Sequence, residues 1–217
     1  MSDIFHEVDE EVRRERLRQF WERYSLLIVG AAVLVVVAIA AWQINEYWMA
    51  KKAAAAGARF EAAVTLSEQG KHAEAESAFA KAAADAPDGY RILSRFRAAA
   101  EAAQVKPADA VKDYDALAAD AALGSLWQEL ASLRAGMLLV DSAPLAELKK
   151  RLDPLVAPDR IYRHSARELL ALSAWRNKDT AAAKHYLDMI ANDADTPPGT
   201  RTRADVLSAL IAANGKS

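Results

Sequence analysis

The side chains that most often carry out chemistry are few in this chain and lie on separate predicted elements. Its four histidines are spread along the sequence, at positions His6, His72, His164 and His185. The chain has no cysteine, which excludes disulfide bonds and thiol chemistry. The sequence also lacks a glycine-rich phosphate loop, a G-x-S-x-G elbow and an H-E-x-x-H motif. We therefore expect no catalytic residues, no metal and no cofactor, and we predict that the protein is not an enzyme.

The charge pattern indicates that nucleic acid is not a partner. The formal net charge is -2 at pH 7, and no block of lysine and arginine stands out after residue 48. Proteins that bind nucleic acid need such a cluster to neutralise phosphates. Acidic residues are abundant, but pairs such as Glu74 and Glu76 fall on predicted solvent-facing helix surfaces. We therefore look for function in surfaces that contact proteins or lipid.

An uncharged, apolar run at residues 24–45 predicts a membrane-spanning helix. Such a helix needs about 20 consecutive, mostly apolar residues, and this run is long enough. Trp21 precedes the run, Trp42 lies near its end and Trp48 follows it, which is typical of aromatic rings at the two membrane surfaces. We expect this segment to anchor the chain in a lipid bilayer.

Basic residues flanking the run indicate its orientation. Five arginines precede it closely, whereas three lysines or arginines follow within a comparable distance. Because basic residues favour the cytoplasmic side, we predict a cytoplasmic tail at residues 1–23 and a periplasmic domain at residues 46–217. The tail carries an apolar helical stripe formed by Ile4, Val8 and Val12. A cleavable signal peptide, with residues 38–40 as its cleavage box, is the alternative.

The predicted domain is composed of helix-forming residues and contains an internal repeat. Alanine is abundant and β-branched residues are scarce outside the anchor, which predicts an all-α fold. In the first copy, a helix ends at Gly70 and a second helix carries Ala75, Phe79 and Ala82 before Pro87. The spacing A-x3-F followed by proline resembles the second half of a tetratricopeptide repeat (TPR), in which the small residue allows close helix approach.

Later copies repeat this spacing with lower fidelity. Ala110, Tyr114 and Leu117 form the second copy, and two further copies place apolar residues at 148, 152 and 155 and at 183, 187 and 190. A final helix after residue 199 has no partner copy, and we assign it a capping role. The sequence thus predicts a TPR-like solenoid of about four divergent helical hairpins with a C-terminal capping helix.

Three stretches carry a resemblance that covers nearly the full length of the chain. They are the charged tail at residues 3–25, the first repeat at 68–87 and the late stretch at 169–197. With the single anchor between tail and repeats, the chain resembles the ancillary SecYEG translocon subunit family. The resemblance implies a bacterial inner-membrane protein with periplasmic repeats. Its implied partners are SecYEG, a membrane-bound periplasmic chaperone and unfolded secretory proteins.

By the TPR resemblance, the first helix of each hairpin lines a concave face that binds clients. The residues predicted for this face are Phe60, Val64, Ile92, Arg95, Leu133, Met137, Leu172 and Trp175. An apolar stripe at helical spacing is more often core, and we expect core positions for at least half of them. The leading functional hypothesis is a translocon adaptor. The alternatives are a scaffold for another envelope complex, such as cytochrome maturation, and a regulator that sequesters a signalling protein.

Overall fold

The computed structural model describes residues 3–214, and every regular element in this range is helical. The chain divides into two compact units, Met1–Ala54 and Ala55–Ser217. The side chains of the predicted tail stripe, Ile4, Val8 and Val12, lie outside the described residues. The all-α prediction is confirmed. The limits drawn for the tail, the span and the periplasmic domain stay predictions.

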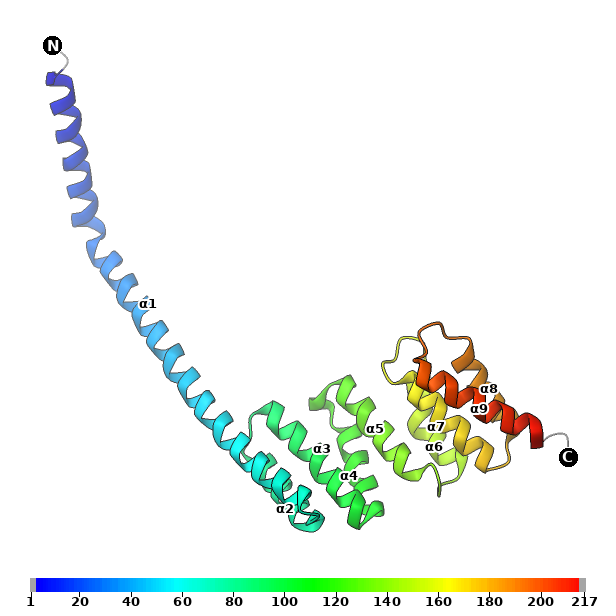
Figure 1. Cartoon of the computed structure of the whole chain (residues 1–217). Coiled ribbons are helices and arrows are strands. Elements are labelled where there is room, and N and C mark those ends of the chain that lie inside the picture. The colour runs from blue at the N-terminus through cyan, green and yellow to red at the C-terminus, as the bar shows by residue number, and fades with distance from the viewer. Residues whose placement is uncertain (1–2, 215–217) are drawn as a thin grey trace. The chain divides into compact units, whose positions relative to one another are not determined.

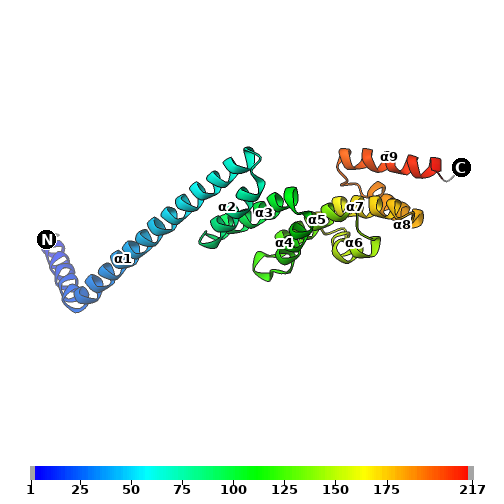
Figure 2. The same ribbon diagram turned by 90° about the horizontal axis from the view of Figure 1, so that it is seen from below.

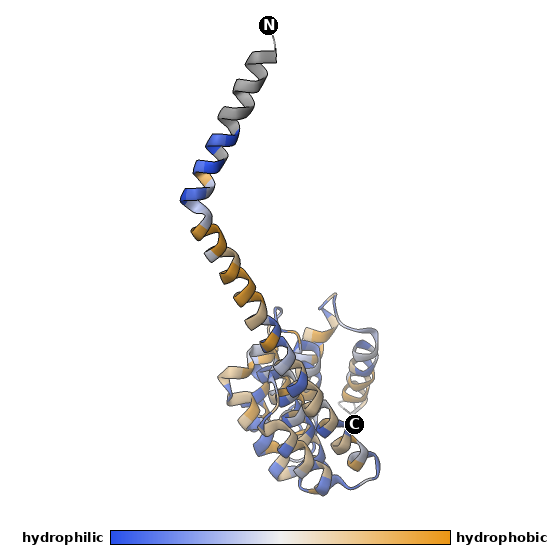
Figure 3. Cartoon of the chain, turned by 90° about the vertical axis from the view of Figure 1, so that its left-hand side faces the viewer, coloured by the Kyte–Doolittle hydropathy of each residue, from blue (hydrophilic) through white to orange (hydrophobic). Residues whose placement is uncertain are grey.

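Helix α1 (Asp3–Glu68) contains the apolar run of the first unit. It is the one helix in the described part of the chain that is long and apolar enough to cross a membrane. Figure 3 shows the run as a band of hydrophobic residues along the helix, and its large side chains are exposed. Water solvates such side chains poorly, so a lipid environment suits them better.

The second unit is a series of helical hairpins (Figure 1). The end of α1 pairs with α2 (His72–Ala84). The remaining elements are α3 (Asp88–Val105), α4 (Pro107–Ala119), η1 (Ala121–Leu123), α5 (Ser125–Leu139), α6 (Leu145–Leu152), η2 (Asp153–Leu155), α7 (Arg163–Arg176), α8 (Thr180–Ala191) and α9 (Pro198–Asn214). From α2 onward each α-helix packs against the next, and α9 also contacts α7 (Figure 2). This order of packing is the TPR-like solenoid that the repeat spacing predicted.

The second helix of every hairpin buries the apolar residues that define the repeat. Their spacing of four and then three residues places them on one helix face. The four buried sets are Ala75, Phe79 and Ala82 in α2; Ala110, Tyr114 and Leu117 in α4; Leu148, Leu152 and Leu155 in α6 and η2; and Ala183, Leu187 and Ile190 in α8. Pro87 directly precedes α3, while α2 already ends at Ala84.

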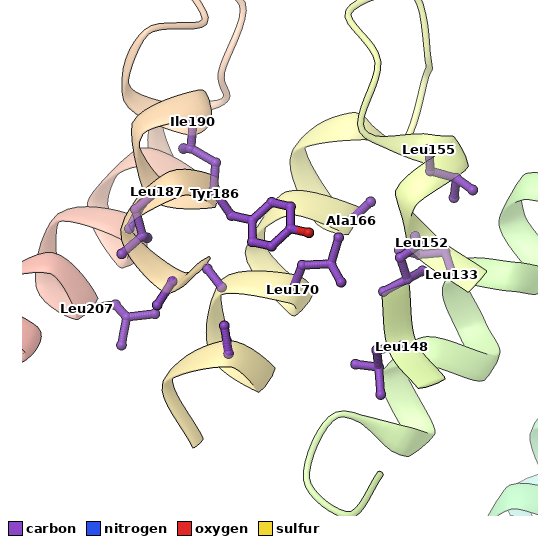
Figure 4. Close-up of a cluster of buried hydrophobic side chains, with 14 of the residues drawn as sticks. Leu133, Leu148, Leu152, Leu155, Ala166, Leu170, Tyr186, Leu187, Ile190 and Leu207 are labelled. Atoms are coloured by element: carbon purple, nitrogen blue, oxygen red, sulfur yellow. The ribbon is translucent and has the colours of Figure 1, made fainter. Parts of the chain in front are cut away.

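Buried side chains form three clusters along the solenoid. The first joins α1 and α2, where the ring of Phe79 meets that of Phe60 edge-on at 5.2 Å. The second joins α3, α4 and α5, and the third spans α5 to α9 (Figure 4). In the third, a Cβ added at Gly136 would lie 3.0 Å from two Leu152 methyl carbons. The two helices of this hairpin therefore approach closely because position 136 has no side chain.

Two hairpin turns share one backbone arrangement. At Gly70 (φ +73°) and at Lys178 (φ 63°) the chain adopts a left-handed conformation just after a helix. In both turns the next residue donates to a carbonyl five positions back, as Lys71 does to Leu66 at 3.0 Å. A left-handed residue followed by this hydrogen bond is the arrangement of a Schellman C-cap, in which glycine is favoured. Position 178 therefore carries a lysine where the backbone prefers glycine.

We predict that Phe79→Ala destabilises the repeat unit by about 3–5 kcal/mol. The ring is fully buried, so its removal loses transfer free energy and leaves a cavity. Urea unfolding of the full chain in detergent, followed by circular dichroism, measures the effect. The control Leu93→Ala removes an exposed side chain and should change stability by less than about 0.5 kcal/mol. Equal effects of the two variants would contradict the packing role of Phe79.

We predict that Lys178→Gly stabilises the domain by about 0.5–1 kcal/mol. Glycine removes the cost of a left-handed lysine but adds backbone entropy to the unfolded chain, so the gain is partial. The same unfolding assay tests this. The control Lys184→Gly places glycine inside α8 and should cost about 1 kcal/mol. A loss of stability at both positions would show that the turn does not require a left-handed residue.

Candidate functional site

Large exposed apolar side chains in the repeat unit concentrate on the first helices of the hairpins and on the C-terminal capping helix α9. In the described part of residues 55–214, the large exposed ones are Leu93, Val105, Leu126, Met137, Ile161, Leu172, Trp175, Val206 and Leu210. All except Ile161, which lies in a loop, belong to α3, α5, α7 or α9. Helices α2, α4, α6 and α8 contribute none of them. We call these exposed residues of α3, α5, α7 and α9 the first-helix surface.

Three of the predicted concave-face residues lie on the first-helix surface. Met137 on α5 is 48% exposed, and on α7 Leu172 and Trp175 are 36% and 38% exposed. A flexible thioether and a large indole are side chains that often anchor protein interfaces. Their exposure leaves them accessible to a partner.

Three others pack partly into the cores. Phe60 and Val64 of α1 lie against Ala63, Ala75 and Phe79. Ile92 of α3 lies against the second cluster, beside Phe96 and Trp127. With Leu133 these residues make up half of the predicted face, in line with the expectation that at least half would be core.

Leu133 and Arg95 require correction. Leu133 is only 6% exposed and belongs to the third core cluster, so it is not accessible to a client. Arg95 donates to Asp120 at 2.6 Å and lines a cavity between α2, α3 and α4. It lies two positions after the exposed Leu93, which places it on nearly the opposite side of α3. Both errors arise from helix register.

Sequence reasoning missed five members of the first-helix surface, namely Leu93, Val105, Leu126, Val206 and Leu210. Leu93 directly follows the predicted Ile92, so the helix was correct and the position was wrong by one residue. On α9, Val206 and Leu210 are four residues apart, which signals a second apolar face beside the buried Ala204, Leu207 and Ile211. That signal was present in the sequence.

A buried carboxylate joins the first two hairpins. Glu101 of α3 is 5% exposed, and it accepts from the Ser67 hydroxyl at 2.6 Å and from His72 Nδ1 at 2.8 Å. In a nucleophilic triad the serine bonds to the histidine, which takes its proton. Here Ser67 donates to the carboxylate instead. The arrangement therefore fastens three helices together and does not activate the serine.

Burial and hydrogen bonding act in opposite directions on Glu101. Burial alone raises the pKa of a carboxyl, but the hydrogen bonds from Ser67 and His72 and the charge of Arg97 outweigh it. The pKa of Glu101 is therefore lowered from 4.5.

A second polar cluster fixes the C-terminal hairpin. Asp193, which follows α8, accepts from Arg163 at 2.8 Å and from Arg167 at 2.7 Å. The buried Arg167 also donates to the backbone carbonyls of Val156 and Met189. The hydrogen bond from Arg163 is the main reason that the pKa of Asp193 lies well below its usual range; burial opposes it. These contacts tie α7 to Val156 in the loop before it and to Asp193 after α8. Arg163 and Arg167 thus both have Asp193 as an ion-pair partner.

No group of three or more metal-ligating side chains occurs among the described residues. The contacts of these two polar clusters are structural, whereas the exposed side chains of the first-helix surface are free to contact a partner.

A comparison with protein families identifies the domain type. A family profile described as a tetratricopeptide repeat-like domain matches residues 18–159. The match begins before the apolar run and extends past η2. No curated protein and no solved structure matches the chain.

We predict an acid-dependent contribution of Glu101 to stability. Because the pKa of Glu101 is lowered in the folded state, its contribution is fully present above the unfolded value near 4.5 and is lost as the pH falls below it. Glu101→Gln should therefore show a weaker loss of stability than the unmodified chain between neutral and strongly acidic pH. Urea midpoints measured across this range test the difference. The exposed control Glu74→Gln should keep the original pH profile, and an unchanged profile in Glu101→Gln would refute the prediction.

Proposed function

The chain belongs to the tetratricopeptide repeat-like domain family, and from this premise we propose that it is a non-enzymatic, membrane-anchored adaptor that binds other proteins. TPR-like repeats are typically protein-interaction modules. The single observation that carries the proposal is the location of the exposed apolar residues. In the repeat unit, the large ones that lie in helices occur on α3, α5, α7 and α9 and not on α2, α4, α6 or α8.

This distribution follows from the solenoid and suits a binding surface. Scattered exposed apolar residues are normal, but here the large ones within α2 to α9 are restricted to the first helices and α9. Solenoids use the extended surface formed by such helices to bind partners. Met137, Leu172 and Trp175 offer apolar contact without a fixed charge pattern. An unfolded or extended apolar segment is a suitable client for them.

The anchor and its flanking charges support a location in the bacterial inner membrane. The arginine excess before the run favours a cytoplasmic N-terminus and a repeat unit in the periplasm. The same orientation is implied by the resemblance to the ancillary SecYEG translocon subunit family. On this proposal the repeats receive secretory proteins emerging from SecYEG and pass them to a membrane-bound periplasmic chaperone.

Site-specific photo-crosslinking in cells tests the proposal. A photoreactive residue at Met137 or Trp175 should crosslink to SecYEG subunits and to many different secretory proteins. The control position Lys184 is exposed on α8, away from the first-helix surface, and should give several-fold less product. Mass spectrometry identifies the captured proteins.

The identity of the products decides between the functional hypotheses. One stoichiometric partner unrelated to secretion would contradict the translocon proposal and favour a scaffold or a regulator. Equal crosslinking from Lys184 would contradict the role of the first-helix surface.

A further inference from the structure

A cavity of about 310 Å³ lies between α2, α3 and α4. Its lining contains three residues from each helix: Glu76, Ala80 and Ala83 of α2, Arg95, Ala98 and Ala99 of α3, and Asp113, Ala116 and Leu117 of α4. Helix α3 packs against both α2 and α4 and forms the floor between them. The floor residues lie on nearly the opposite side of α3 from Leu93. The cavity therefore lies away from Leu93 of the first-helix surface.

Small side chains keep the cavity open. Five of its nine lining residues are alanines: Ala80 and Ala83 on α2, Ala98 and Ala99 on α3, and Ala116 on α4. A methyl group at each of these positions leaves space that a longer side chain would fill. The volume lies at the lower end of the range for sites that hold a small ligand group. It is large enough for one long side chain of another protein.

The charges around the cavity are unbalanced. Glu76 and Asp113 have no hydrogen-bond or ion-pair partner among the described residues. The one cation in the lining, Arg95, is neutralised by Asp120 at 2.6 Å. Burial, followed by the nearby charge of Asp109, raises the pKa of Asp113, while Lys112 opposes the shift. Two carboxylates therefore remain at an alanine-lined cavity without an ion-pair partner among the described residues, since Lys112 is itself paired with Asp109 at 2.9 Å.

We propose that this cavity is a second protein-binding site, which receives an arginine side chain from a partner protein. The methylene groups of the arginine pack against the alanines, since long basic side chains bury their stems on apolar surface. The guanidinium group, with five donors, pairs with Glu76 and Asp113. This site goes beyond the proposed function, because its partner is chosen by charge and binds on the side formed by the second helices.

Nuclear magnetic resonance of the full chain in detergent, with labelled alanine methyl groups, tests the site. The probe is a blocked pentapeptide with arginine at its centre and alanine elsewhere. Its matched control replaces arginine by citrulline, which has nearly the same shape and no charge. We expect saturable shifts of Ala80, Ala83, Ala98, Ala99 and Ala116 with the arginine peptide only.

A pair of charge variants completes the test. Glu76→Gln/Asp113→Asn should weaken binding of the arginine peptide at least tenfold, about 1.4 kcal/mol. The control Glu68→Gln/Glu74→Gln removes the same charge from exposed positions outside the cavity and should bind as the unmodified chain does. Equal shifts with the citrulline peptide, shifts at other alanines only, or equal affinity in the two double variants would overturn the proposal.

Discussion

Close approach between paired helices is the constraint on which the repeat unit depends. In three hairpins an alanine of the second helix, Ala75, Ala110 or Ala183, is fully buried at the contact. The third hairpin has leucines at the corresponding face, and its first helix instead provides Gly136, directly against Leu152. In the third hairpin the small residue lies on the first helix and not on the second, but the two helices still pack closely. Backbones can approach only where at least one side chain is small, so either solution permits the same packing.

This packing gives the two classes of helix different surfaces. A second helix buries one narrow face and exposes polar residues and alanines elsewhere, as α2 and α4 do. A first helix also contacts the neighbouring first helices; α7, for example, packs against α5 and α9 as well as against α6 and α8. Apolar residues are therefore needed around much of a first helix, and some of them lie on its solvent-exposed side. The first-helix surface is a consequence of the stacking itself, which explains why α3, α5, α7 and α9 all contribute to it.

The same difference explains what could be predicted from the sequence. The second-helix residues were located correctly because one buried face produces a clear period, as in Ala75, Phe79 and Ala82. The first helices have apolar residues on several sides, so Ile92 and Leu93 look equivalent in sequence although one faces the core and the other faces solvent. The cavity between α2, α3 and α4 requires residues from three helices and gives no local signal. Glu101 was likewise unpredictable, because its partners Ser67 and His72 precede it by about 30 residues.

Two surfaces of different chemistry allow two kinds of recognition on one domain. An apolar surface without fixed charges discriminates weakly, because many apolar segments gain similar free energy by covering it. The cavity at Glu76 and Asp113 discriminates by charge, since only a basic side chain can form ion pairs with its two carboxylates. A domain that must accept varied clients while keeping one dedicated partner needs both properties. The solenoid separates them physically, because Leu93 of the first-helix surface and the cavity lie on different sides of α3.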